Sequence, residues 1–247
     1  TDGYGLSFTG ASNTVGGATT LQNTGALVLG NEATDSIGFT GGLDARGTAG
    51  VDSPLITILA GTVATQGGAG ILLNDATLIA ATTLDSTSGG AAAGGAVVTT
   101  GTLTGGSNTL TIDAGTAGVV TTSAFSGVDS FTLLDAASAT FAAASDGTTV
   151  DLNLTTGGAI TFNGLLTATT LTTDADDTGV AGDASFDLAL NAGAAITNDT
   201  NFDTTGALTL GAAGLTSSFA GGLSTTGVGS TVTLNGTVAT TGTNLDL

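Results

Sequence analysis

The sequence predicts an all-β fold in which short parallel strands wind into a β-solenoid, as one elongated domain over residues 1–247. Three observations predict it: a short glycine-bearing pattern that recurs, apolar residues that alternate with threonine inside each unit, and the lack of helical periodicity. At about 20 residues per coil the chain gives about 12 coils. A spacing of about 4.8 Å between strands then predicts a rod on the order of 60 Å long.

The recurring pattern is an apolar residue, a small or polar residue and a glycine. Its clearest copies are Phe8-Thr9-Gly10, Phe39-Thr40-Gly41, Phe125-Ser126-Gly127, Phe162-Asn163-Gly164 and Phe219-Ala220-Gly221. Weaker copies are Leu59-Ala60-Gly61, Thr99-Thr100-Gly101 and Leu234-Asn235-Gly236. Gly41, Gly61 and Gly101 set the period of about 20 residues, with Ala81 in the empty place. The recurrence predicts that phenylalanine fills one place per coil and forms an internal stack.

Longer alignments support the repeat. Residues 95–104 match residues 158–167, and residues 109–114 match residues 170–175. Elsewhere the spacing is looser, which indicates loops of variable length between regular coils.

Within each unit apolar residues alternate with threonine, as in residues 207–210 and 231–234. Such alternation is typical of half-buried strands, and the glycine, asparagine, aspartate and serine residues between them favour turns. One coil cannot bury its apolar face alone, so coils are expected to stack. An antiparallel β-sandwich is the alternative, with Asn163-Gly164 and Asn235-Gly236 as hairpin turns.

The composition excludes several classes of function. The chain has no cysteine or histidine and one basic residue, Arg46, against 20 acidic residues, for a formal net charge of -19. It therefore has no disulfide or thiolate metal site, and we expect no contact with nucleic acid or anionic membranes. Histidine, cysteine and lysine are the usual groups for catalysis near neutral pH, so we expect no enzyme. Hydrophobic residues at 40% argue against disorder, and no apolar stretch is long enough for a membrane-spanning helix.

Residues 158–164 and 206–210 resemble the repeat-rich passengers of filamentous-haemagglutinin-like proteins and autotransporter adhesins, and the resemblance covers nearly the whole chain. It implies export across a Gram-negative envelope, a right-handed parallel β-helix, and roles in attachment, biofilm or surface layers. It implies no catalytic residues. We therefore expect a secreted, non-catalytic scaffold or stalk of a bacterial surface adhesin. On this interpretation the chain is a segment of a longer one, carries no cofactor, and contacts itself or components of host, cell surface or matrix.

Two further functions stay open. Uncapped ends would expose strand edges, which favours end-to-end stacking into an extracellular filament or surface layer. The second open function is that of a solenoid that binds ice or calcium. Paired threonines resemble an ice-binding ladder but fall at different phases of the coil, which favours an ordinary strand surface. Arg46 either marks a contact between neighbouring molecules or is incidental.

Calcium is the ligand that the residue types favour, because it takes six to eight oxygen ligands. The first candidate set is Asp174, Asp176, Asp177 and Asp183, and the second is Asn198, Asp199, Asn201 and Asp203. Neither set has the spacing of a known calcium loop. The alternative interpretation, solvated aspartates in turns, is the one that their threonine- and glycine-rich setting favours.

Overall fold

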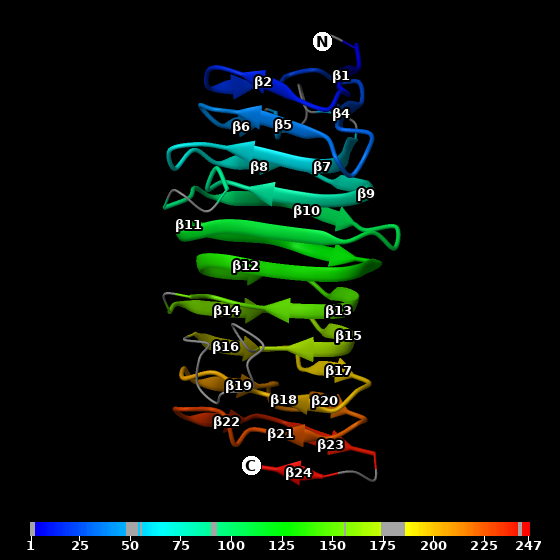
Figure 1. Ribbon diagram of the computed structural model, residues 1–247. Coiled ribbons are helices and arrows are strands. Elements are labelled where there is room, and N and C mark those ends of the chain that lie inside the picture. Colours follow the sequence, from blue (N-terminus) through cyan, green and yellow to red (C-terminus); the bar gives the residue numbers. More distant parts are fainter. Residues whose placement is uncertain are drawn as a thin grey trace.

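A computed structural model describes residues 3–47, 54, 56–89, 93–155, 157–173, 186–241 and 244–247. These residues form an all-β solenoid without a helix, in which the turns stack along one axis and the chain's two ends lie at opposite ends of the stack (Figure 1). The solenoid has about 10 turns, roughly 22 residues apart. The predicted coil of about 20 residues is close to this spacing, whereas the predicted number of about 12 coils was too high. At about 4.8 Å per turn the rod is about 50 Å long.

Strand pairing divides the solenoid into three columns. The first column begins with β1 and includes β1 (Leu6–Phe8), β4 (Leu27–Leu29), β17 (Ala194–Ile196), β20 (Thr216–Phe219) and β23 (Thr237–Thr240). The second includes β2 (Asn13–Val15), β5 (Ser36–Phe39), β18 (Thr200–Asn201), β21 (Leu223–Ser224) and β24 (Leu245–Asp246). The third includes β3 (Thr19–Thr20), β6 (Leu43–Asp44), β8 (Ile71–Leu73), β14 (Ala159–Phe162), β16 (Asp187–Leu190), β19 (Leu208–Leu210) and β22 (Val232–Leu234).

Long strands in the middle of the rod bend from one column into the next. They are β7 (Thr57–Thr65), β9 (Ala76–Asp85), β10 (Val97–Thr104), β11 (Leu110–Ser126), β12 (Val128–Phe141), β13 (Ser145–Leu152) and β15 (Leu166–Thr172). β11 takes part in all three columns, since it pairs along its length with strands of each. Bent strands of this kind leave few loops in the central turns, and their ladders shift register where the strands bend.

Every pairing between the described strands is parallel. In the third column, for example, Ile160 pairs with Ala139 of the preceding turn and with Leu188 of the following one. A sandwich built from hairpins would pair its strands antiparallel, so the β-sandwich alternative is wrong. Asn163 and Asn235, which it used as hairpin turns, follow β14 and β22 at the same corner of the solenoid.

The alternation seen in the sequence decides which residues are buried. In β4, Leu27 and Leu29 are fully buried, whereas Val28 between them is half-exposed. Stacking repeats this arrangement on each turn, and the inward leucine, isoleucine, valine and phenylalanine residues form one continuous core. Burial of this apolar area is the main stabilising term, and no single turn could provide it.

Phenylalanine forms an internal stack, but not at one place per coil. Phe125 lies in the first column and Phe162 in the third, yet both point into the same central turns. Phe125 stacks on Phe131 with ring centroids 4.2 Å apart, and Phe141 stacks on Phe162 at 4.4 Å. The two pairs meet edge to face, with Phe125 and Phe141 5.5 Å apart. Rings from all three columns can meet because the core is narrow.

The predicted series of glycines joins positions that are not equivalent. Gly41 follows β5 between the second and third columns, Gly61 lies in β7 between the first and second, and Gly101 lies in β10 between the third and first. The longer alignments were correct. Residues 95–104 and 158–167 both run from the third column into the first, and residues 109–112 and 170–172 both lie in the second.

Several corners depend on a glycine that a larger residue could not replace. Gly30 follows β4, has a φ of +80° and donates its N–H to the Phe8 carbonyl oxygen at 2.9 Å. A Cβ atom at this position would overlap the Ala60 carbonyl group of the next turn. Glycine at this corner therefore lets two turns approach to the distance of a backbone hydrogen bond.

Apolar side chains are less well covered in the terminal turns than in the central ones. Phe8 and Val15 in the first turn are only partly buried. In the last turn Leu234 is 39% exposed and Leu245 47% exposed. The equivalent residues of the central turns are fully buried, because a further turn covers them on each side.

Candidate functional site

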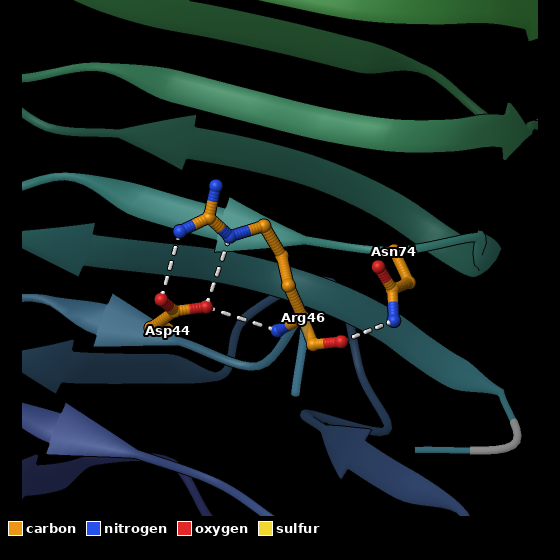
Figure 2. Close-up of polar contacts among 3 residues, drawn as sticks. All are labelled: Asp44, Arg46 and Asn74. Carbon is orange, nitrogen blue, oxygen red and sulfur yellow. Dashed lines mark hydrogen bonds and ion pairs between the residues drawn. The ribbon is translucent and has the colours of Figure 1, made fainter. Parts of the chain in front are cut away.

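Arg46, the only cationic side chain in the sequence, pairs within the chain. Its Nη2 atom lies 2.9 Å from Oδ2 of Asp44, and its Nε atom donates to Oδ1 of the same carboxylate at 3.1 Å (Figure 2). Asn74 of the next turn donates its amide N–H to the Arg46 carbonyl oxygen at 2.7 Å. Both charged side chains are about one-third exposed, so this bidentate pair contributes modestly to stability. It satisfies the cation without a neighbouring molecule.

Of the two predicted calcium sets, only the second lies among the described residues. Asp174, Asp176, Asp177 and Asp183 lie outside the described residues. In the second set, Asp199 and Asn201 are exposed, whereas Asp203 is buried. Thr200 and Phe202 point inward between the exposed residues, and the alternation ends at Asp203, which is buried next to Phe202. Among the described residues no three acidic side chains come close enough to hold a metal ion.

Three other aspartates stack at the corner where the second column ends. Asp85 pairs with Asp113, and Asp113 with Asp135, on successive turns. Asp85 is 8% exposed, and its two oxygens accept hydrogen bonds from the N–H groups of Thr87 and Gly89 at 2.7 and 2.8 Å. We call these three residues the aspartate row.

The ionised form of Asp113, the middle residue of the aspartate row, is destabilised by its surroundings. Burial raises the pKa of Asp113 above its usual value, and the negative charges of Asp85 and Asp135 on either side raise it further. A hydrogen bond from the Gly115 N–H at 3.0 Å lowers the pKa but does not offset these effects. The sequence analysis missed the row. The signal was present in the repeated order of threonine, an apolar residue and aspartate at residues 83–85 and 111–113. Hydrogen bonds to turn N–H groups indicate that these carboxylates shape the corner.

The raised pKa of Asp113 predicts that this residue contributes more to stability as the pH falls. A carboxyl whose pKa is raised by folding contributes stability that is complete below its usual value of 3.8 and is lost as the pH rises through the raised value. We expect Asp113→Asn to raise the melting temperature at pH 7 and to flatten its dependence on pH between about 4 and 7. Thermal unfolding followed by circular dichroism across this range measures both effects.

Asp44→Asn is the matched control with the opposite sign. The hydrogen bond from Arg46 lowers the pKa of Asp44, so its contribution is present at neutral pH and is lost as the pH falls through the lowered value. This variant is expected to lower the melting temperature slightly at pH 7 and to have less effect in acid. If Asp113→Asn behaved in the same way as Asp44→Asn, the electrostatic interpretation of the row would be wrong.

Outward hydroxyl side chains form a row in the second column, which we call the threonine row. Its members, which pair in register on successive turns, are Ser36, Thr62, Thr83, Thr111 and Thr132. The sequence analysis placed the paired threonines at different phases. This is correct for pairs such as Thr102/Thr104 and Thr231/Thr233, which lie in the first and third columns, but Thr109/Thr111 and Thr170/Thr172 share the second.

A hollow of about 300 Å³ lies beside the threonine row near the start of the rod. Its floor is the outward row Thr14, Gly38 and Ala64, which pair in register and lead to Asp85 on the fourth turn. Gly38 and Ala64 have small side chains or none, so the surface is depressed between Thr14 and the turn at residues 85–89. We call this feature the second-column hollow.

The described residues contain no helix that is long and apolar enough to cross a membrane. Comparisons of the chain with protein-family models, with curated proteins and with solved structures found no match. The arrangement of the residues alone therefore supports the β-solenoid repeat fold.

Proposed function

We propose that this chain is a non-catalytic structural rod of the bacterial cell exterior, a scaffold or stalk of a surface adhesin. The observation that supports the proposal is the uniform stack of parallel turns, which places the two ends of the chain at opposite ends of one rod (Figure 1). A stack of this kind sets a distance between whatever is joined to its ends. Its length is fixed by the number of turns.

The surface chemistry fits an exterior location. The net charge of -19 keeps rods apart in solution, and the sequence has no cysteine to oxidise. The carboxylates of the aspartate row accept hydrogen bonds from groups of their own corner, so their positions are explained by a structural role. These features agree with a mechanical role and give no support to an enzyme.

Removal of one whole turn tests the stalk. Ser138 pairs with Ala159, and Ala139 with Ile160, so deletion of residues 139–159 joins equivalent positions. We expect a folded rod that is shorter by about 4.8 Å and, when displayed between a membrane anchor and a binding domain, still supports attachment of cells. Circular dichroism, small-angle X-ray scattering and a cell-attachment assay measure these results.

Deletion of residues 139–149 is the control, because it joins Ser138 in the third column to Val150 in the second. This half-turn deletion is expected to unfold the central turns and abolish attachment. If the whole-turn deletion kept the fold but abolished attachment, the rod would not be a simple spacer, and the proposal would fail.

A self-assembling filament is the second candidate, and the uniform parallel pairing of the turns favours it. The ladder that joins each turn to the next, as in Leu190–Leu210 and Leu210–Leu234, is the pairing by which one rod would join another. Electron microscopy of the full chain, with and without millimolar calcium, distinguishes the two candidates. Long uniform fibres would support the filament, and separate rods of one length would support the stalk.

A further inference from the structure

The second-column hollow is a concave polar site with one rigid wall. The turn at residues 85–89 forms this wall, and Asp85 fixes it by accepting hydrogen bonds from Thr87 N–H, Thr87 Oγ1 and Gly89 N–H at 2.7, 2.6 and 2.8 Å. The floor belongs to β2, β5 and β7, which are held in register by the ladder. The hollow is therefore preformed, as small-molecule sites usually are.

The polar groups around the hollow are neutral except for Asp85. The side chains of Thr14, Ser36, Thr62 and Gln66 line the hollow and are exposed or partly buried, so a ligand can reach their hydroxyl and amide groups. Hydroxyl and amide groups both donate and accept hydrogen bonds. They therefore match a ligand that presents several hydroxyl groups on adjacent atoms.

Charge excludes the other classes of small ligand. An anionic ligand needs a cation, and Arg46 is already paired with Asp44 in the third column. A bare metal ion such as calcium needs six to eight oxygen ligands, and Asp85 is the one carboxylate among the residues that line the hollow. The aromatic side chain at the site, Phe39, is fully buried, so the apolar surface of the floor comes from small groups such as Ala64.

The geometry points to the second-column hollow as a binding site for a neutral saccharide. A hollow of about 300 Å³ lies at the small end of ligand pockets and accommodates one or two sugar rings. Ser36, Thr62 and Gln66 bind the ring hydroxyls. This inference is independent of the proposed function, because a stalk and a filament could each carry such a site along its length.

Gly38→Thr tests the site without disturbing the fold. A Cβ atom at Gly38 would meet only Asn13 O at 3.8 Å and Thr14 Oγ1 at 3.9 Å, and Gly38 does not have a positive φ. Threonine suits an outward strand position and would fill the floor of the hollow. In saturation-transfer NMR with lactose, cellobiose, maltose and diacetylchitobiose, we expect the full chain to bind at least one sugar. We expect Gly38→Thr to weaken that binding by about tenfold or more.

Ala189→Thr is the matched control, because Ala189 is an outward residue of the third column between Thr161 and Thr209 and lies outside the hollow. It should leave sugar binding unchanged. Equal binding by the parent and Gly38→Thr, with circular dichroism showing both folded, would overturn the inference. Binding of none of the four sugars, or of calcium or glucuronate alone, would overturn it as well.

Discussion

Replacement of Phe162 by alanine is expected to destabilise the rod by about 3–5 kcal/mol, as is usual for truncation of a fully buried aromatic residue. Phe162 is 0% exposed, stacks on Phe141 at 4.4 Å and meets Phe125 edge to face at 6.3 Å. Alanine would leave a cavity against both rings, and the ladders on either side would hold that cavity open. Urea unfolding followed by circular dichroism measures the loss.

Thr161→Ser is the control for Phe162→Ala. Thr161 precedes Phe162 in β14 and points outward, in register with Thr140 of the preceding turn. Loss of its methyl group is expected to change stability by less than about 0.5 kcal/mol. Similar losses in the two variants would mean that β14 does not direct Phe162 into the core. Hydrogen exchange should also show that Phe162→Ala opens the central turns before the terminal ones.

The second large effect is expected from Gly30→Ala. Two costs combine at this corner. A positive φ costs an L-residue about 1–2 kcal/mol, and overlap of the new Cβ atom with the Ala60 carbonyl group adds about 1–3 kcal/mol. The overlap also pushes apart the strands β4 and β7, which pair from Leu27 to Leu29. A lower urea midpoint for this variant is the expected result.

Gly214→Ala separates the two costs. Gly214 has a φ of +82°, close to the +80° of Gly30, and nothing lies within 4 Å of its added Cβ atom. This variant should therefore show only the cost of the positive φ, about 1–2 kcal/mol. If the two alanine variants lost the same stability, the close approach of the turns at Gly30 would contribute nothing.

The sequence alone predicted the class of fold because the alternation of apolar residues with threonine is local. In β19 and β22, Leu208, Leu210 and Val232 followed the predicted inward pattern, and the threonines between them point outward. Alternation of this kind depends only on the two-residue period of a strand. The alternation within a strand is therefore independent of the lengths of the loops on either side.

The length of a turn could not be predicted in the same way. Leu29 pairs with Leu59, whereas Leu133 pairs with Leu152, and the connections between them differ by several residues. A loop can lengthen at little cost in free energy, so the spacing of glycines carries weak information about the register. The aligned segments 95–104 and 158–167 were more reliable, because a whole strand–corner–strand unit has to match.

The second-column hollow was beyond sequence analysis for a related reason. Gly38 and Ala64 form its floor only because they occupy the same outward row of neighbouring turns. Nothing local to either residue marks it as part of a site. Polar groups such as Ser36 and Thr62 also look the same in sequence whether or not a hollow lies beside them.

The parallel ladders have a consequence for a rod that is held at its two ends. Hydrogen bonds between turns run along the axis, so a pulling force loads them one row at a time and peels a terminal turn away from the next. Each released turn of roughly 22 residues adds about 75 Å of extended chain. Tension would therefore lengthen the protein in steps from its ends, and the phenylalanine-filled central turns would be the last to open.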